Sequence, residues 1–180
     1  NENQEIMQTP DFVDRYTQLP ETTPQRVKDL AFEITSEEDN WYDKVRAIEN
    51  YFSKEAYVYD QFDVPVPEEG QDYVDQFLFE TQRGYCDNFS TSMVVLVRAL
   101  GIPARWAKGY TEGEYSRQVD TMYKLYEISN NNAHSWVEVF FPEVGWVPFE
   151  PTVGFSNDVS WQYDLDVPDW ENEEGRVPEQ

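Results

Sequence analysis

Two stretches near the start of the chain carry apolar residues at helical spacing. In the first, apolar side chains return every three or four positions, at Val27, Leu30, Ala31 and Ile34. The preceding TTP, residues 22–24, offers a capping hydroxyl and then a first-turn proline, so a helix is expected over about 24–35. In the second, the apolar positions are Trp41, Val45, Ile48 and Phe52, with Asn40 placed to cap them. Both stripes are typical of helices packed against a core.

A third helical pattern begins at the chain's only cysteine. From Cys86, the apolar positions are Phe89, Met93, Leu96, Val97 and Leu100. Gly101 and Pro103 then stop the pattern as expected of a helix C-terminus. The pattern follows a proline-broken loop at 64–70 and the segment DYVDQFLF, which suggests a short helix. We therefore predict a buried central helix whose first turn holds Cys86.

The second half of the chain favours strands. The expected strands are RWAKGYT (105–111), MYKLYEI (122–128), AHSWVEVFF (133–141) and GWVPFE (145–150). Turn-forming stretches such as SNNN and PEVG separate them. Helices first and strands afterwards indicate an α+β domain, in which N-terminal helices and a central helix pack on an antiparallel β-sheet.

The length of 180 residues fits one domain with an ordinary core, expected here over residues 21–155. Residues 1–20 are polar, contain Pro10 and Pro20, and are interpreted as an N-terminal arm. Residues 156–180 hold eight acidic residues and one arginine, and form either an acidic segment across the domain or a linker. No run approaches the roughly 20 apolar residues of a membrane span, so membrane segments are expected only outside this portion.

Composition narrows the choice of partners and cofactors. The chain has 36 acidic and 13 basic residues, and its net charge of −23 repels nucleic acids and anionic lipid surfaces. This charge either serves solubility or attracts basic substrates such as lysine-bearing proteins. A single cysteine excludes an internal disulfide, and the chain has neither zinc-ligand spacing nor a D-x-[DN]-x-[DN]-G calcium loop. No metal is therefore expected.

Cys86 and the chain's only histidine, His134, could form a catalytic pair. A helix N-terminus stabilises a thiolate through its unpaired N–H groups and its dipole, and a neighbouring imidazole can take the proton. His134 lies near the start of a strand and shares a face with Trp136. Glu150 ends the next strand, where its carboxylate could accept the second imidazole N–H. Gly84 is expected to leave space for a substrate backbone.

Each of these residues also has an ordinary structural interpretation. A lone cysteine in an apolar helix is more often a small buried hydrophobic residue than a nucleophile. A lone histidine on a strand is usually a hydrogen-bonded structural residue, and a glutamate at a strand end is usually solvated. The residue types and their placement alone leave both interpretations open.

The blocks GYCDNFSTSMVVLVRALGIPARWAKGY and NNNAHSWVEVFFPEVGWVPFEPT closely resemble the transglutaminase-like superfamily, over about residues 70–155. The resemblance implies a papain-like fold, with Cys86 as nucleophile, His134 as general base and Glu150 as third member of a triad. Glu150 stands where many members have aspartate, so its carboxylate is one methylene further from the backbone. Trp136 and Trp146 match commonly aromatic positions and are expected to shape the substrate-binding site.

The resemblance implies cysteine-dependent acyl transfer on protein or peptide amides through a thioester, without a cofactor. A glutamine side chain would be the donor, and lysine, another amine or water the acceptor. The alternatives are a cysteine peptidase or amidase of the same fold, and a catalytically silent protein-binding module. The implied location is the extracytoplasmic face of the cell membrane, as a domain of a larger membrane protein.

Overall fold

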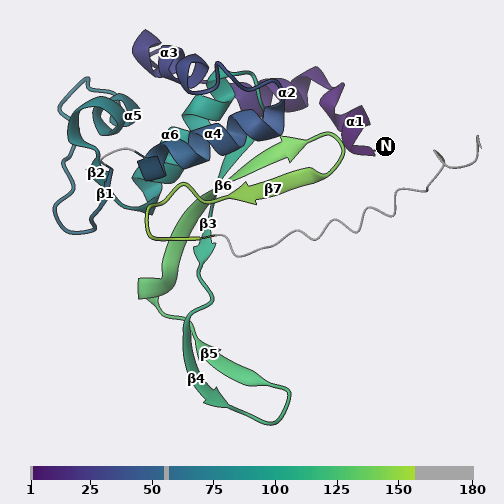
Figure 1. Ribbon diagram of the computed structural model, residues 1–180, viewed down its shortest axis with the longest axis vertical. Coiled ribbons are helices and arrows are strands. Elements are labelled where there is room, and N and C mark those ends of the chain that lie inside the picture. Colours follow the sequence, from purple (N-terminus) through teal and green to yellow (C-terminus); the bar gives the residue numbers. More distant parts are fainter. Residues whose placement is uncertain (1, 55–56, 157–180) are drawn as a thin grey trace, which may run out of the picture.

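The structure is a computed structural model that describes residues 2–54 and 57–156. Helix α6 (Cys86–Ala99) lies at its centre and packs against other helices on one side and a three-stranded sheet on the other (Figure 1). Strands of this sheet follow α6 in the chain, and the helices α3 and α4 precede it. The α+β class and the packing of the central helix on an antiparallel sheet are therefore confirmed.

The helices before α6 are α1 (Glu2–Met7), α2 (Pro10–Thr17), α3 (Gln25–Ile34), α4 (Trp41–Lys54) and α5 (Tyr73–Gln76). Helix α5 continues into a π-helical turn, η1 (Phe77–Thr81). The helices expected near residues 24–35, after Asn40, in DYVDQFLF and from Cys86 are thus all present. Their apolar stripes face the core, because Val27, Val45 and Ile48 are fully buried.

One of the two predicted helix caps is formed and the other is not. Asn40 Oδ1 accepts the N–H of Asp43 at 2.9 Å, as expected of an N-cap. At α3, however, Pro24 itself occupies the N-cap position, and no side chain accepts a hydrogen bond there. The hydroxyl of Thr23 is buried with no hydrogen-bond partner, so the predicted hydroxyl cap of this helix is wrong.

The main sheet has the strand order β3–β6–β7, with antiparallel neighbours. The strands are β3 (Ala104–Tyr110), β6 (Ala133–Phe141) and β7 (Gly145–Phe149), close to their predicted bounds. A separate parallel pair, β1 (Val58–Tyr59) and β2 (Arg83–Gly84), leads directly into α6 and had no clear signal in the sequence. The chain thus arrives at Cys86 from a short strand that is held by β1.

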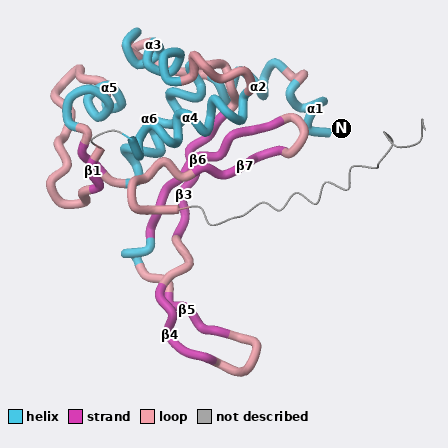
Figure 2. Tube along the Cα trace, viewed as in Figure 1, coloured by secondary structure: helices cyan, strands magenta, loops and turns pink. Residues whose placement is uncertain are grey.

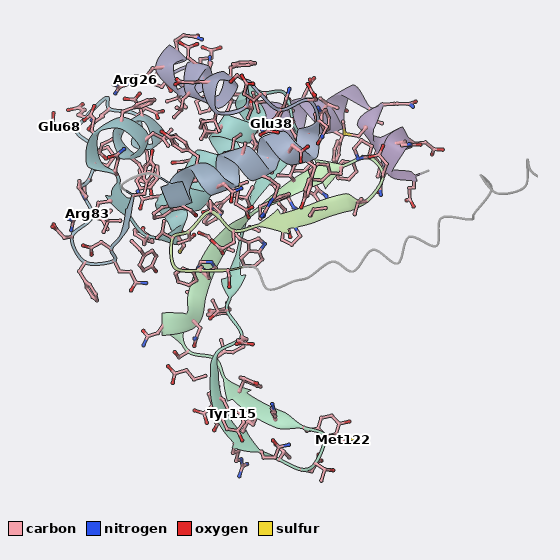
Figure 3. All side chains as sticks on the ribbon, in the orientation of Figure 1. Arg26, Glu38, Glu68, Arg83, Tyr115 and Met122 are labelled. Atoms are coloured by element: carbon pink, nitrogen blue, oxygen red, sulfur yellow. The ribbon has the colours of Figure 1, made fainter. Side chains whose placement is uncertain are left out.

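A β-hairpin projects away from the main sheet, as Figures 1 and 2 show. Its strands, β4 (Glu114–Gln118) and β5 (Lys124–Glu127), pair with each other, and the 3₁₀ turn η2 (Asn130–Asn132) leads back into β6. The prediction that residues 122–128 form a strand of the sheet on the central helix is therefore wrong. Strand β4 was not predicted. Every residue of both strands is exposed, so no buried face imposes an alternation of apolar and polar residues on the sequence. The labels Tyr115 and Met122 locate the hairpin in Figure 3.

A cluster of aromatic rings packs in the core beside α6. The ring of Phe89 on α6 lies 5.0 Å from that of Phe77 and 5.7 Å from that of Phe52, measured between centroids. On the sheet side, Val137 and Val139 of β6 are fully buried. Because burial of this apolar surface is the main stabilising term, the core fixes α6 against both α4 and β6.

The predicted N-terminal arm is helical and packs along the domain. The ring of Phe12 on α2 lies 4.8 Å from that of Phe140, and the ring of Tyr16 lies 4.8 Å from that of Trp146. Residues 157–180, the bulk of the predicted acidic segment, lie outside the described residues. Among the described residues, no helix is both long and apolar enough to cross a membrane.

Candidate active site

Cys86 is the first residue of α6 and is only 7% exposed. Tyr85 is the N-cap residue, and its N–H donates to Asn88 Oδ1 at 3.1 Å, which ties down the start of the helix. The first N–H groups of a helix lack intrahelical partners and carry a partial positive charge, which favours a thiolate there. The sulfur therefore lies where the sequence predicted it, at the positive end of a buried helix.

His134 and Glu150 are brought together by the pairing of β6 with β7. The register aligns Val137 with Phe149, so Glu150, which directly follows β7, lies on the same face of the sheet as His134. His134 Nε2 is 2.5 Å from Glu150 Oε2. The other carboxylate oxygen, Oε1, accepts the N–H of Thr152 at 2.9 Å. The longer glutamate side chain thus reaches the imidazole while folding back onto its own chain.

The side chains of Cys86 and His134 line the same cleft and affect each other's ionisation. Because Nε2 of His134 bonds to Glu150, the other ring nitrogen, Nδ1, is left for the sulfur. Burial by itself would raise the pKa of Cys86, but hydrogen bonds from His134 and from the side chain and backbone of Ser135 hold it below its ordinary value. The structure therefore places the three predicted residues in one row, with Cys86 beside His134 and His134 bonded to Glu150.

The pKa of His134 moves in the opposite direction. Burial by itself would lower it, but the hydrogen bonds to Cys86 and Glu150, and their negative charges, raise it to about 9. Below that pH the imidazole is protonated. The two shifts together favour a thiolate beside an imidazolium at neutral pH, which is the reactive form of a nucleophilic cysteine.

A network of polar side chains that the sequence analysis did not single out lies around the sulfur. Ser135 Oγ donates to Asp87 Oδ1 at 2.8 Å, and Trp106 Nε1 donates to Ser90 Oγ at 2.9 Å. Ser90 in turn donates to the carbonyl oxygen of Cys86 at 2.7 Å. Asp87 follows Cys86 and Ser135 follows His134 in the chain, so adjacency was the one signal that could have found them.

Two further residues, Glu49 and Phe155, contact Glu150 and His134 from outside α6, β6 and β7. Glu49 on α4 accepts the backbone N–H of Glu150 at 2.8 Å. The ring of Phe155 stacks on the imidazole of His134, with centroids 4.4 Å apart and planes 14° from parallel. Glu49 interrupts the apolar stripe of α4 between Ile48 and Phe52, and an acidic residue within such a stripe is the sequence signal that could have found it.

A cleft of about 780 Å³ opens over the Cys86–His134 pair. Its lining residues are Gln61, Tyr85, Cys86, Asp87, Trp106, Lys108, Gly109, Tyr110, Asn130, Asn131, Ala133, His134 and Ser135. This volume accommodates a side chain together with part of its backbone. Within residues 2–54 and 57–156, no three His, Cys, Asp or Glu side chains gather as a metal site.

Two of the three predicted substrate-binding residues have other roles. A Cβ on Gly84 would lie 2.4 Å from the side chain of Asn88, so the space beside this glycine is filled and does not admit a substrate. Trp146 pairs with Phe140, which lies six residues from His134, or about 20 Å along β6. At that end of the sheet, Trp146 packs against Tyr16 of the N-terminal arm. Both predictions are corrected: Gly84 allows close packing at the start of α6, and Trp146 anchors α2.

Trp136 lies closer to the site. It shares a face of β6 with His134, and a Cβ on Gly109 would approach its ring to 2.9 Å. Trp136 itself is not among the residues that line the cleft, although Gly109 is. If Trp136 shapes the site, it does so by packing against Gly109, which lines the cleft. This role of Trp136 stays a prediction.

A cysteine at the start of a central helix, with histidine and a carboxylate from adjoining antiparallel strands, defines the site of a papain-like fold. The chain belongs to the transglutaminase-like superfamily, whose family model matches residues 28–151. Both the resemblance and the papain-like fold expected from the sequence are thereby confirmed.

Among curated proteins, the chain is 58% identical over 146 residues to the uncharacterized protein YebA of Bacillus subtilis (81% of this chain). It is 36% identical over 138 residues to a protein-glutamine gamma-glutamyltransferase of Pseudomonas aeruginosa (77% of this chain). The chain spans about a fifth of the length of these two relatives. Among solved structures, it is similar to the periplasmic domain of TgpA from Pseudomonas aeruginosa, with a TM-score of 0.68 and 32% identity over 82% of this chain and 49% of that one.

Proposed function

We propose that the protein catalyses cysteine-dependent acyl transfer on side-chain amides of proteins or peptides, in the manner of a protein-glutamine γ-glutamyltransferase or the corresponding hydrolase. The observation that carries the proposal is the row of Cys86, His134 and Glu150 beside one cleft, with its His134–Glu150 hydrogen bond and the opposed pKa shifts of the thiol and the imidazole. A buried cysteine that serves only for packing would have a raised pKa, because burial disfavours the thiolate. The family and the named transferase relative support the same chemistry.

In the first half of the reaction, the Cys86 thiolate attacks the carbonyl carbon of a glutamine side chain in the cleft. The resulting oxyanion needs hydrogen-bond donors, and the backbone N–H of Cys86 at the helix start is the candidate we assign. When the C–N bond breaks, protonated His134 gives its proton to the departing nitrogen, and ammonia leaves. The product is a thioester on Cys86, and the imidazole is then neutral.

In the second half, neutral His134 takes a proton from the acceptor as this attacks the thioester carbon. The C–S bond breaks and the thiolate returns beside the imidazolium, which restores the starting state. An amine acceptor gives transamidation, and water gives hydrolysis. Glu150 keeps the ring oriented throughout, because its Oε2 holds Nε2 while Nδ1 faces the sulfur.

The proposed substrates are proteins or peptides, and the proposed location is extracytoplasmic. The cleft is large enough for a glutamine side chain and its neighbours, and Tyr110, Asn130 and Asn131 extend its lining to the base of the hairpin. The net charge of −23 would favour basic amine acceptors such as lysine over anionic partners. The solved relative is a periplasmic domain, which supports placement outside the cytoplasm.

The test is incubation of the folded domain with a glutamine-containing peptide, with and without biotinylated cadaverine. Ammonia release together with incorporation of the amine indicates transamidation, and ammonia release with glutamate formation indicates hydrolysis. We expect Cys86→Ala to lower either rate by several orders of magnitude, because triad members act as a unit. Asp75→Asn is the matched control, since this buried carboxylate pairs with Arg26 and does not line the cleft. Unchanged turnover in Cys86→Ala would contradict the proposal.

A further inference from the structure

Glu49 is a buried carboxylate directly behind the candidate active site. It lies on the core-facing side of α4 between Ile48 and Phe52, and only 9% of its surface is exposed. One of its oxygens, Oε1, accepts the backbone N–H of Glu150 at 2.8 Å, and the other bonds to Arg46 one turn earlier. The carboxylate therefore links the middle of α4 to the end of β7, 101 positions away in the chain.

The backbone N–H of Glu150 needs a hydrogen-bond acceptor outside the sheet. Strand β7 ends at Phe149, and the next residue after Glu150 is Pro151, which has no N–H to continue the strand pairing. A buried backbone N–H without an acceptor costs about 1–3 kcal/mol, so the Glu150 N–H requires one from elsewhere in the fold. Glu49 supplies it, and the Glu150 carboxylate then reaches His134 with Oε2.

Stability alone does not account for a carboxylate at this position. Burial raises the pKa of Glu49, and the charge of Glu150 raises it further, while the Glu150 N–H and Arg46 offset this only in part. Ionising a buried carboxylate near another one is unfavourable, and an apolar side chain of similar size would suit the stripe on α4 better. The acceptor oxygen is the feature that an apolar residue could not replace.

We propose that Glu49 is a positioning residue for the Cys86–His134–Glu150 row, holding the Glu150 backbone so that its carboxylate keeps the imidazole in line with the sulfur. The effect passes from Glu49 through the backbone of Glu150 to His134, and Glu49 touches neither the sulfur nor the imidazole. This inference rests on the proposed function in one respect, which is that Cys86, His134 and Glu150 are taken as the reacting groups.

The test uses the fact that the chain has one histidine and one cysteine. The imidazole resonances of the folded domain report the pKa of His134 alone, and the rate of alkylation by iodoacetamide reports the thiolate of Cys86 alone. Glu49→Leu removes the acceptor with little change in volume. Glu49→Gln keeps an acceptor oxygen, and Asp75→Leu removes a carboxylate that is equally buried but pairs with Arg26 on α3.

We expect Glu49→Leu to lower the pKa of His134 from about 9 toward its ordinary 6.5 and to slow alkylation of Cys86 at neutral pH about tenfold. Glu49→Gln should stay within about twofold of the wild-type rate, because it restores the hydrogen bond. Asp75→Leu should lose stability and leave both readouts unchanged. If Glu49→Leu does not fold, Glu49→Asp replaces it, since aspartate is one methylene too short to reach the Glu150 N–H.

A Glu49→Leu protein with the wild-type His134 titration and alkylation rate would overturn the proposal. An equal loss in Asp75→Leu would overturn it as well, because the effect would then be general destabilisation. Neither readout depends on amide turnover. A wild-type domain that titrates as expected but releases no ammonia would contradict the proposed function and leave the positioning role of Glu49 standing.

Discussion

At the scale of single residues, the charge of Cys86 is set by opposing neighbours. Asp87 Oδ1 lies 3.7 Å from the sulfur, and its negative charge raises the pKa of the thiol. Hydrogen bonds from His134 and Ser135 act in the other direction and outweigh both this charge and the burial. The pKa of Cys86 therefore stays below its ordinary value despite the burial and the charge of Asp87.

Replacing Asp87 by asparagine tests this balance. Removal of the negative charge favours the thiolate, so the pKa of Cys86 should fall further, while the amide oxygen still accepts from Ser135. We expect alkylation by iodoacetamide under mildly acidic conditions to become about three to ten times faster, equivalent to roughly half to one pKa unit. Glu68→Gln, an exposed carboxylate outside the cleft, is the control and should leave the rate unchanged.

The pH dependence of amide turnover follows from the pKa of His134. Because that pKa is raised to about 9, the imidazolium that is proposed to protonate the leaving nitrogen is present below this pH and is lost above it. The rate of ammonia release should therefore decline above about pH 9. Glu150→Gln removes a charge that raises this pKa, so its descending limb should move to lower pH. A limb that stays in place would contradict the assigned role of Glu150.

The main members of the site stood out as candidates because they are rare or stand at element ends, and the resemblance to the transglutaminase-like superfamily supplied their expected roles. Cys86 and His134 are single residues of their kind, and Glu150 closes a strand before a proline. Asp87 and Ser135 had adjacency to Cys86 and His134 as their only signal, and the hydrogen bond that joins them forms only in the fold.

At the scale of elements, the start of α6 is the feature that places Cys86, the proposed nucleophile. Gly84 on β2 packs against Asn88, whose side chain accepts the N–H of Tyr85. At the β2–α6 junction, the side chain of Asn88 thus occupies the space that a Cβ on residue 84 would need. A side chain at position 84 would push Asn88 away and disturb the first turn that carries Cys86.

Gly84→Ala should therefore destabilise the protein and reduce the reactivity of the thiol. Overpacking at such a site costs about 1–3 kcal/mol, measurable by chemical denaturation. Adding Asn88→Ala relieves the contact, so the double variant should be more stable than the sum of the two single losses predicts. Strict additivity would mean that the two residues do not interact as the structure indicates.

The elements that face the core could be read from the sequence, and those that do not face it could not. The stripes of α3, α4 and α6 and the alternation in β6 reflect burial, which leaves a periodic apolar pattern. The strands of the hairpin and the short β1–β2 pair have no such face, so β4 was missed and β5 was assigned to the wrong sheet.

At the scale of the whole molecule, the N-terminal arm is joined to the far end of the sheet. Phe12 contacts both Phe140 and Trp146, and Arg105 lies over the ring of Trp146 at 4.1 Å. The arm thus covers the end of the sheet opposite the cleft. Sequence alone could not place it there, because its few apolar residues show no partner until the strands are assembled.

Phe12→Ala should lower the free energy of unfolding by about 1.5–3 kcal/mol, since the ring is partly buried against other aromatic residues. Alkylation of Cys86 should be unaffected, because this contact lies about 20 Å along the sheet from His134. Phe32→Ala, at a position on α3 that is 60% exposed, is the control and should change stability by less than about 0.5 kcal/mol.

The three members of the row come from parts of the chain that meet only in the complete fold. Helix α6 brings Cys86, and β6 and the end of β7 bring His134 and Glu150, with α4 behind them through Glu49. Loss of any of these packing contacts would separate the sulfur from its base. The proposed catalysis therefore depends on the core between α6 and the sheet.

The central claim, that Cys86 carries the acyl group as a thioester, is tested most directly by mass spectrometry of the intact domain after brief reaction with a glutamine-containing peptide and acid quenching. The account predicts an adduct on Cys86 with the mass of the peptide less one ammonia, discharged by hydroxylamine or an added amine. Ammonia release without any adduct on Cys86, and at the same rate in Cys86→Ala, would contradict it.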